Sequence, residues 1–246
     1  MTHITPENLP EELRRAAGVV TGIAATFTAE DIKAASELPG WTRGHVLAHI
    51  CGIANAMARQ VEFAARGDTI ELYDGGYEGR TRAIEMAAGH TAEEHRADLD
   101  AALDRALHAF GALDGAGWQT PISFRGGVVF DGGLALWREL TIHATDLGTG
   151  RGPETWSRPF CEHLFDFLAA RVPEGQRFVL QPLGLPAVSL GAPGGRTTVI
   201  NGMLTDIAAW LAGRTPTLGS LRATAAADGV DLPELLPWPA GVPVTR

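Results

Sequence analysis

Apolar residues recur at spacings of three and four through most of the first 150 residues, and this helical periodicity constrains the fold more than any other feature. In one segment the stripe consists of Val46, Ile50, Ile53, Met57 and Val61. Long helices are expected over about 10–27, from a cap at Thr42 to about 66–67, from the capping box of Thr91 and Glu94 onward, and over about 133–147. A short helical segment is expected around 80–88, and residues 121–130 suit a hairpin or loop. Four long amphipathic helices predict a bundle.

The pattern changes at the glycine-rich run of residues 148–153. We therefore expect two domains, a four-helix bundle in residues 1–150 and a small α+β domain in residues 151–246. In the second domain, helices over about 157–171 and 202–212 accompany strand-like runs at 177–181, 187–190 and 196–200. This order predicts a short antiparallel sheet and an α+β fold class for the whole chain.

Charge and composition argue against several classes of function. The 246 residues carry 20 basic and 29 acidic side chains, a net charge of −9, and an acidic surface repels nucleic-acid phosphates. No apolar run approaches the roughly 20 residues of a membrane helix, and the polar N-terminus does not resemble a secretory signal. With only two cysteines, a cytoplasmic location is expected. Nucleotide-binding glycine motifs and the G-x-S-x-G elbow are absent, and the sequence carries no signal for oligomeric state.

Two pairs of ionisable residues accompany the apolar stripes, His45 with His49 and Glu139 with His143. Each pair is spaced i, i+4, so its members project from one side of a helix. An unpaired charge aimed at a bundle interior costs several kcal/mol. A metal ion held by His49, Glu139 and His143 would satisfy all three groups, and three protein ligands leave the open position of a catalytic zinc.

The spacing alone leaves a second interpretation open, in which these residues are hydrogen-bonded core side chains without a metal. A histidine on an apolar face is more often such a residue than a ligand. His45 lies closer to the helix start. It either supports a metal-binding residue without binding the metal itself, or belongs to the start of the helix and has no role at the metal.

Three segments resemble motifs of the mycothiol-dependent maleylpyruvate isomerase family, whose N-terminal part is a DinB-like helical bundle. They are GWTRGHVLAH at 40–49, WREL-TIHATDLG at 137–148, and Ile200-Asn201-Gly202 together with WLAGR at 210–214. The segments follow the family's order and span nearly the whole chain. The resemblance implies a DinB-like four-helix bundle followed by a small C-terminal domain.

The resemblance also implies roles for individual residues. His49, Glu139 and His143 would bind zinc, with water completing the coordination shell, and Asp146 would be an active-site acid. Arg82 would lie over the metal, with Arg80, two residues away, as the alternative. Arg214 matches an arginine that the small domain of the family sends back to the site, so the pocket is expected between the two domains.

The function implied is cis–trans isomerisation of a maleylpyruvate-like dicarboxylate with Zn²⁺ and mycothiol as cofactors. An open zinc position binds a thiol as its thiolate, and arginine suits carboxylates. Addition of the thiolate to the double bond, rotation and elimination would give the trans product and return the thiol. A mycothiol S-transferase is the first alternative. A non-catalytic ligand carrier is the second, because the C-terminal half also resembles the small domain of sterol-carrier-like proteins. The acidic loop 67–79 is unexpected beside a site for a dianion.

Overall fold

The computed structural model describes residues 4–225 and 228–239, and the chain divides into two compact units. One unit covers residues 5–150, and the other begins at Arg151. Each unit contains its own buried apolar side chains, including Leu47 and Leu136 in the first unit and Leu164 and Phe178 in the second. The two units are therefore described one at a time.

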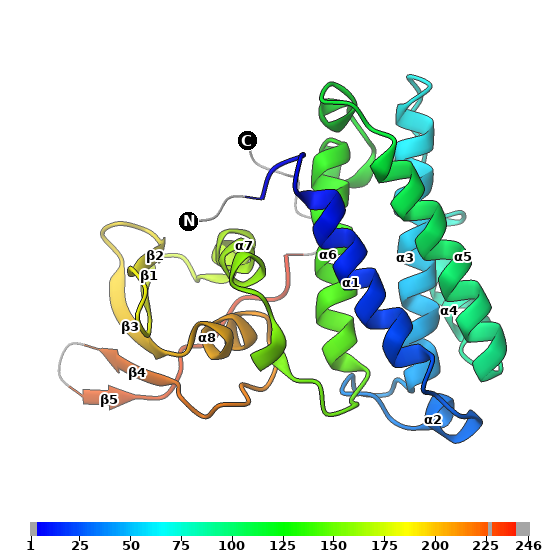
Figure 1. Cartoon of the computed structure of the whole chain (residues 1–246). Helices are drawn as coiled ribbons and strands as arrows, with labels where there is room; N and C mark the ends of the chain where they lie inside the picture. The colour runs from blue at the N-terminus through cyan, green and yellow to red at the C-terminus, as the bar shows by residue number, and fades with distance from the viewer. Residues whose placement is uncertain (1–3, 226–227, 240–246) are drawn as a thin grey trace. The chain divides into compact units, whose positions relative to one another are not determined.

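The first unit is built on four long helices, α1 (Leu9–Ala24), α3 (Arg43–Ala64), α5 (Ala92–Gly111) and α6 (Val129–Asp146). These helices lie side by side in Figure 1. The apolar stripes of the sequence form the shared core, in which Val46, Ile50, Met57, Leu99, Leu103, Leu136 and Leu140 are almost fully buried. The predicted four-helix bundle is confirmed. None of the helices in the described part of the chain has the length and apolar character needed to cross a membrane.

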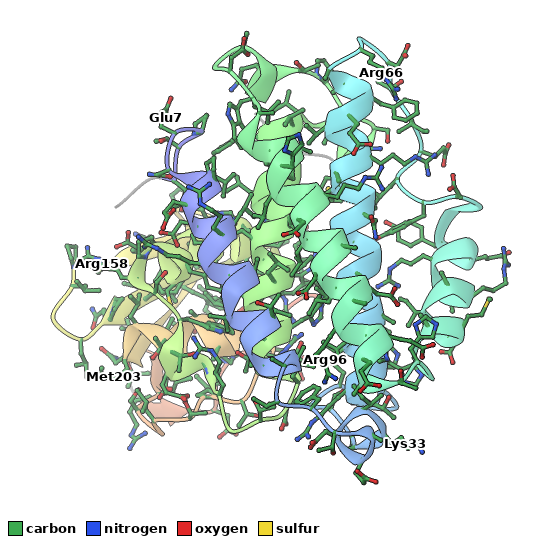
Figure 2. The ribbon with its side chains drawn as sticks, turned by 45° about the vertical axis from the view of Figure 1, so that its right-hand side comes forward. Glu7, Lys33, Arg66, Arg96, Arg158 and Met203 are labelled. Carbon is green, nitrogen blue, oxygen red and sulfur yellow. The ribbon has the colours of Figure 1, made fainter. Side chains whose placement is uncertain are left out.

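Two shorter helices, α2 (Ala29–Lys33) and α4 (Gly76–Ala87), complete this unit. The sequence analysis did not anticipate α2. Figure 2 shows α4 beside α3, with Arg66 and Lys33 marking opposite ends of the bundle. Ile84 is the one buried residue that α4 contributes, so this helix is held by far less apolar packing than its neighbours.

Side-chain caps decide where the long helices begin. Thr91 and Glu94 form the predicted capping box at the start of α5. At α6, the carboxylate of Asp131 accepts the backbone N–H of Val128 at 2.8 Å, so the helix begins about four residues earlier than expected. The glycines inside its first turns permit close packing, since a Cβ on Gly133 would lie 2.8 Å from Leu9 Cδ2. The preceding loop, predicted as a hairpin or loop, is closed by one bridge between Pro121 and Val128.

The second unit contains α7 (Arg158–Leu168), α8 (Leu204–Leu211) and a sheet in the order β2-β1-β3-β4-β5. The strands are β1 (Gln176–Pro182), β2 (Val188–Gly191), β3 (Arg196–Gly202), β4 (Arg222–Ala225) and β5 (Asp228–Val230). The α+β class is confirmed, and the first three strands lie where the sequence predicts them. The last two strands were not predicted.

The expectation of an antiparallel sheet is wrong for the central pair of strands. β3 pairs with β1 in parallel, with Phe178 beside Thr198 and Leu180 beside Ile200. These four side chains are buried, and the Phe178 ring lies 5.7 Å from the Trp210 ring of α8. Pairing β3 with β1 therefore continues one apolar face under the helix, which the alternation of each strand taken alone cannot reveal.

Candidate metal centre

Three potential ligand atoms converge between α3 and α6. His49 Nε2 lies 2.8 Å from Glu139 Oε2 and 3.0 Å from His143 Nε2, and His143 Nε2 lies 3.0 Å from Glu139 Oε2. His49 comes from the second turn of α3, and the other two residues occupy successive turns of α6. The side chains are 7%, 29% and 13% exposed for His49, Glu139 and His143. The structure thus brings together the three residues that the sequence analysis selected as ligands.

Asp146 fixes the orientation of the His143 ring. Its Oδ2 lies 2.8 Å from His143 Nδ1, and the carboxylate is almost fully buried, with 1% of the side chain exposed. The ring therefore donates its Nδ1 proton to Asp146 and directs the other nitrogen, Nε2, toward the cluster. This pairing places Asp146 behind a ligand, where its carboxylate acts through His143.

The ionisation of the cluster reflects burial opposed by hydrogen bonds. Burial lowers the pKa of His143, but hydrogen bonds to Asp146 and Glu139 outweigh it and raise that pKa to about 9. Burial also lowers the pKa of His49. For Glu139, burial acts to raise the pKa, but the hydrogen bonds from His143 and His49 hold it well below its usual range. Without a metal, the protonated His143 ring stabilises the cluster because it pairs with the carboxylates of Glu139 and Asp146.

Arg80 of α4 approaches His49 from the opposite edge of its ring. Arg80 Nη2 donates to His49 Nδ1 at 2.9 Å, and its guanidinium carbon lies 5.9 Å from the centre of the Tyr73 ring. Because an arginine only donates, His49 Nδ1 is the acceptor and carries no proton in this arrangement. Coordination through Nε2 requires the proton on Nδ1, so a bound metal and this hydrogen bond exclude each other.

The residues present fit a zinc ion. The three pairwise separations of 2.8 to 3.0 Å are close to the approximately 3.3 Å between ligands of a tetrahedral zinc with bonds of about 2.0–2.1 Å. Two imidazoles and one carboxylate form a donor set used by catalytic zinc. Within the described part of the chain, this is the cluster of His, Cys, Asp and Glu residues whose ligand atoms all lie within 4.8 Å of one another.

The expectation that Arg82 lies over the metal is not met. Its side chain is 68% exposed and faces Glu78, with Arg82 Nη1 at 3.8 Å from the carboxylate. Residues two apart on a helix point about 200° from each other, so the helix that brings Arg80 to His49 turns Arg82 away. The sequence analysis named Arg80 only as the alternative, and the two positions are too close in the motif for a resemblance to separate them.

His45 caps its helix and does not join the ligand cluster. Thr42 Oγ1 and His45 Nδ1 lie 2.7 Å apart, and the backbone N–H of Thr42 donates to the same ring nitrogen at 3.2 Å. Histidine thus takes the place that glutamate or glutamine usually holds in a capping box. The ring also stacks on Trp41, with centroids 6.1 Å apart, and Trp41 contacts the edge of the His49 ring.

Arg214 follows α8 in the second unit. Its backbone N–H donates to the carbonyl of Ala209 at 2.8 Å, and its guanidinium donates to the carbonyl of Ala212 at 3.0 Å. Contacts with carbonyls at a helix C-terminus are favourable for a cation. Its predicted role at the metal stays a prediction.

Both parts of the chain match models of one protein family. The model described as the mycothiol maleylpyruvate isomerase N-terminal domain matches residues 13–148, and the MDMPI C-terminal domain matches residues 155–237. No curated protein matches the chain.

Two solved structures share the fold. They are crystal structures of the mycothiol-dependent maleylpyruvate isomerase and of a histidine-to-alanine mutant, with TM-scores of 0.82 and 0.81. Each is 20% identical in sequence and aligns over 96% of this chain and 99% of the other. The similarity of fold agrees with the two family matches, which together span most of the sequence. The chain belongs to the mycothiol maleylpyruvate isomerase family.

Proposed function

We propose that this protein is a zinc- and mycothiol-dependent enzyme that isomerises a maleylpyruvate-like dicarboxylate from cis to trans. The observation that carries the proposal is the convergence of His49, Glu139 and His143 at 2.8 to 3.0 Å, with the His143 ring oriented by Asp146. Family membership supplies the reaction and the thiol.

His49, Glu139 and His143 would hold the zinc, and the bound ion would lower the pKa of a thiol so that the thiolate forms at neutral pH. Asp146 would hold a proton on His143 Nδ1, so that Nε2, after losing its own proton, would be the nitrogen that binds the zinc. Glu139 supplies the negative charge of the site, and its pKa stays well below the usual range. These residues prepare the site without taking part in bond formation.

Arg80 is the cation that the bundle offers to a substrate carboxylate. It lies beside the ligand His49, and its remaining N–H groups suit bidentate pairing with a carboxylate. We propose that Arg214 holds the second carboxylate, as the family resemblance implies. Holding both carboxylates fixes the ends of the substrate while its central bond rotates.

The reaction is tested by incubating zinc-loaded protein with maleylpyruvate and a substoichiometric amount of mycothiol, and by following the product spectrum. We expect complete conversion with the thiol concentration unchanged at the end. A reaction without thiol overturns the proposal. Consumption of one thiol per substrate, with a stable conjugate accumulating, establishes a mycothiol S-transferase instead. Binding of the substrate without any turnover in the presence of thiol would identify a ligand carrier.

A further inference from the structure

The C-terminus of α6 is held by the segment that leads into α3. The backbone N–H of Glu37 donates to the carbonyl of Asp146 at 2.9 Å. Arg43, the first residue of α3, donates from Nε to the carbonyl of Leu147 and from Nη2 to that of Gly148, both at 2.8 Å. The last carbonyls of a helix have no partner within the helix, so these bonds complete the end of α6 from outside. One arginine side chain therefore joins the end of one ligand-bearing helix to the start of the other.

Further contacts fix the guanidinium of Arg43 in this place. Its Nη1 donates to Asp31 Oδ1 of α2 at 2.7 Å, and its central carbon lies 5.2 Å from the centre of the Phe27 ring. The side chain is 16% exposed, and a positive charge at a helix C-terminus is favourable for the helix dipole. The guanidinium is planar, so its N–H groups hold a fixed geometry. Arg43 cannot move without breaking several bonds together, and the connection between α3 and α6 is therefore a rigid one.

This connection lies close to the metal ligands on both helices. His49 follows Arg43 by six residues, about 9 Å along α3, and His143 precedes Leu147 by four residues, about 6 Å along α6. The ligand atoms of α3 and α6 lie 2.8 to 3.0 Å apart, and a metal site tolerates displacements of only about 0.5 Å. Because the ligands come from two helices, their separation depends on how α3 is set against α6. A rigid connection less than two helical turns away limits sliding between them.

We propose that Arg43 is a positioning residue of the metal centre, which sets the distance between His49 and His143 by holding the C-terminus of α6 against the start of α3. Its role differs from that of Asp146, which orients a single imidazole ring. Arg43 acts through the backbone carbonyls of Leu147 and Gly148, and so affects the spacing of the helices. This role rests on the proposed function in one respect, the zinc ion itself, and requires neither thiol nor substrate.

Zinc affinity, measured by competition with a chelating dye while circular dichroism shows each variant folded, tests this role. Arg43→Met keeps the apolar stem and loses the hydrogen bonds. It should weaken zinc binding by about tenfold, the lower end of the range for residues that support metal ligands, and should change the visible absorption of the cobalt-substituted protein, which follows coordination geometry. Asp31→Asn is the matched control, because it removes the ion pair but leaves both carbonyl bonds of Arg43. It should lower the free energy of unfolding of the metal-free protein and keep the wild-type zinc affinity and cobalt spectrum.

Arg43→Lys keeps the charge but lacks the planar fork that reaches both carbonyls together, so its zinc affinity should fall between those of the wild type and Arg43→Met. If Arg43→Met does not fold, Arg43→Lys takes its place in the comparison with Asp31→Asn. Wild-type zinc affinity and an unchanged cobalt spectrum in the Arg43 variant overturn the proposal. An equally large loss of zinc affinity in Asp31→Asn does the same, because it would trace the effect to the stability of the fold. A wild type that binds no zinc overturns both this role and the proposed metal, whereas a zinc-binding wild type without isomerase activity contradicts the proposed reaction alone.

Discussion

His49 lies between two helices that are held in place very differently. On its Nε2 side, α6 is buried along most of its length and carries Glu139, His143 and Asp146 in one hydrogen-bonded series. On its Nδ1 side, α4 has Ile84 as its one buried residue and delivers Arg80. Ligand atoms must stay within a few tenths of an ångström of their positions, which α6 supports. Arg80 has to leave His49 when a metal binds. It lies on α4, the less tightly packed of the two helices.

The chemistry of the imidazole ring explains why the two sides differ. With Arg80 donating to Nδ1, His49 has its proton on Nε2, which is the wrong nitrogen for coordination. Loading the metal therefore requires Arg80 to release His49. On the α6 side, Asp146 accepts the Nδ1 proton of His143, so this ring has only to lose its Nε2 proton to coordinate a metal. The rigid side is prepared for the ion, and the weakly packed side adjusts to it.

The largest expected effect comes from removing a ligand on the rigid side. His143→Ala should abolish stable zinc binding, because two remaining ligands cannot form the three-ligand site of a catalytic zinc. Elemental analysis of dialysed protein should find about one zinc per chain in the wild type and almost none in the variant. His108→Ala, a change in α5 outside the cluster, is the control that should keep its metal. Full zinc occupancy in His143→Ala would sink the assignment of this ligand.

The second effect is a loss of stability of the metal-free protein at alkaline pH. The pKa of His143 is raised from 6.5 to about 9, so its protonated form stabilises the fold fully below pH 6.5. That contribution, about 3 kcal/mol for such a shift, is lost as the pH rises through 9. Denaturant titrations of chelator-treated protein between pH 6.5 and 9 measure it. The pKa of His49 is lowered, so its own effect falls below pH 6.5, outside this window.

Asp146→Asn is the matched test of that pH dependence. The amide keeps the shape of the side chain but removes the carboxylate that raises the pKa of His143. The stability of the variant should change less between pH 6.5 and 9 than that of the wild type. An unchanged slope would show that the Asp146 carboxylate does not control His143.

The smallest effect is expected for His45, on the side of α4. Its ring caps α3 through Thr42, and its Nε2 lies 3.5 Å from Glu85 Oε2 of α4. His45→Ala should lower the free energy of unfolding by about 1 kcal/mol, as the loss of a cap does, while zinc content stays at the wild-type level. Thermal denaturation and elemental analysis measure the two quantities. A loss of metal would place His45 among the groups that control coordination.

The ligand set could be predicted from the sequence because its geometry is largely local. On one helix, residues spaced by four project from the same side, so the spacing alone places Glu139 and His143 next to each other. His49 shares its helix with the apolar stripe of Val46, Ile53 and Met57, which indicated which way that helix faces. The capping box at Thr91 was predictable for the same reason, since its two residues lie three apart.

What the tertiary structure alone decided depends on contacts between segments distant in the sequence. The choice between Arg80 and Arg82 is set by the rotation of α4 against α3, and a two-residue difference reverses the direction of the side chain. Burial of Asp146, the last residue of α6, follows from packing around that helix. Likewise, the parallel pairing of β1 with β3 arises from the apolar face shared with α8. Local periodicity fixes how a helix or strand divides into faces, but packing between elements determines what each face meets.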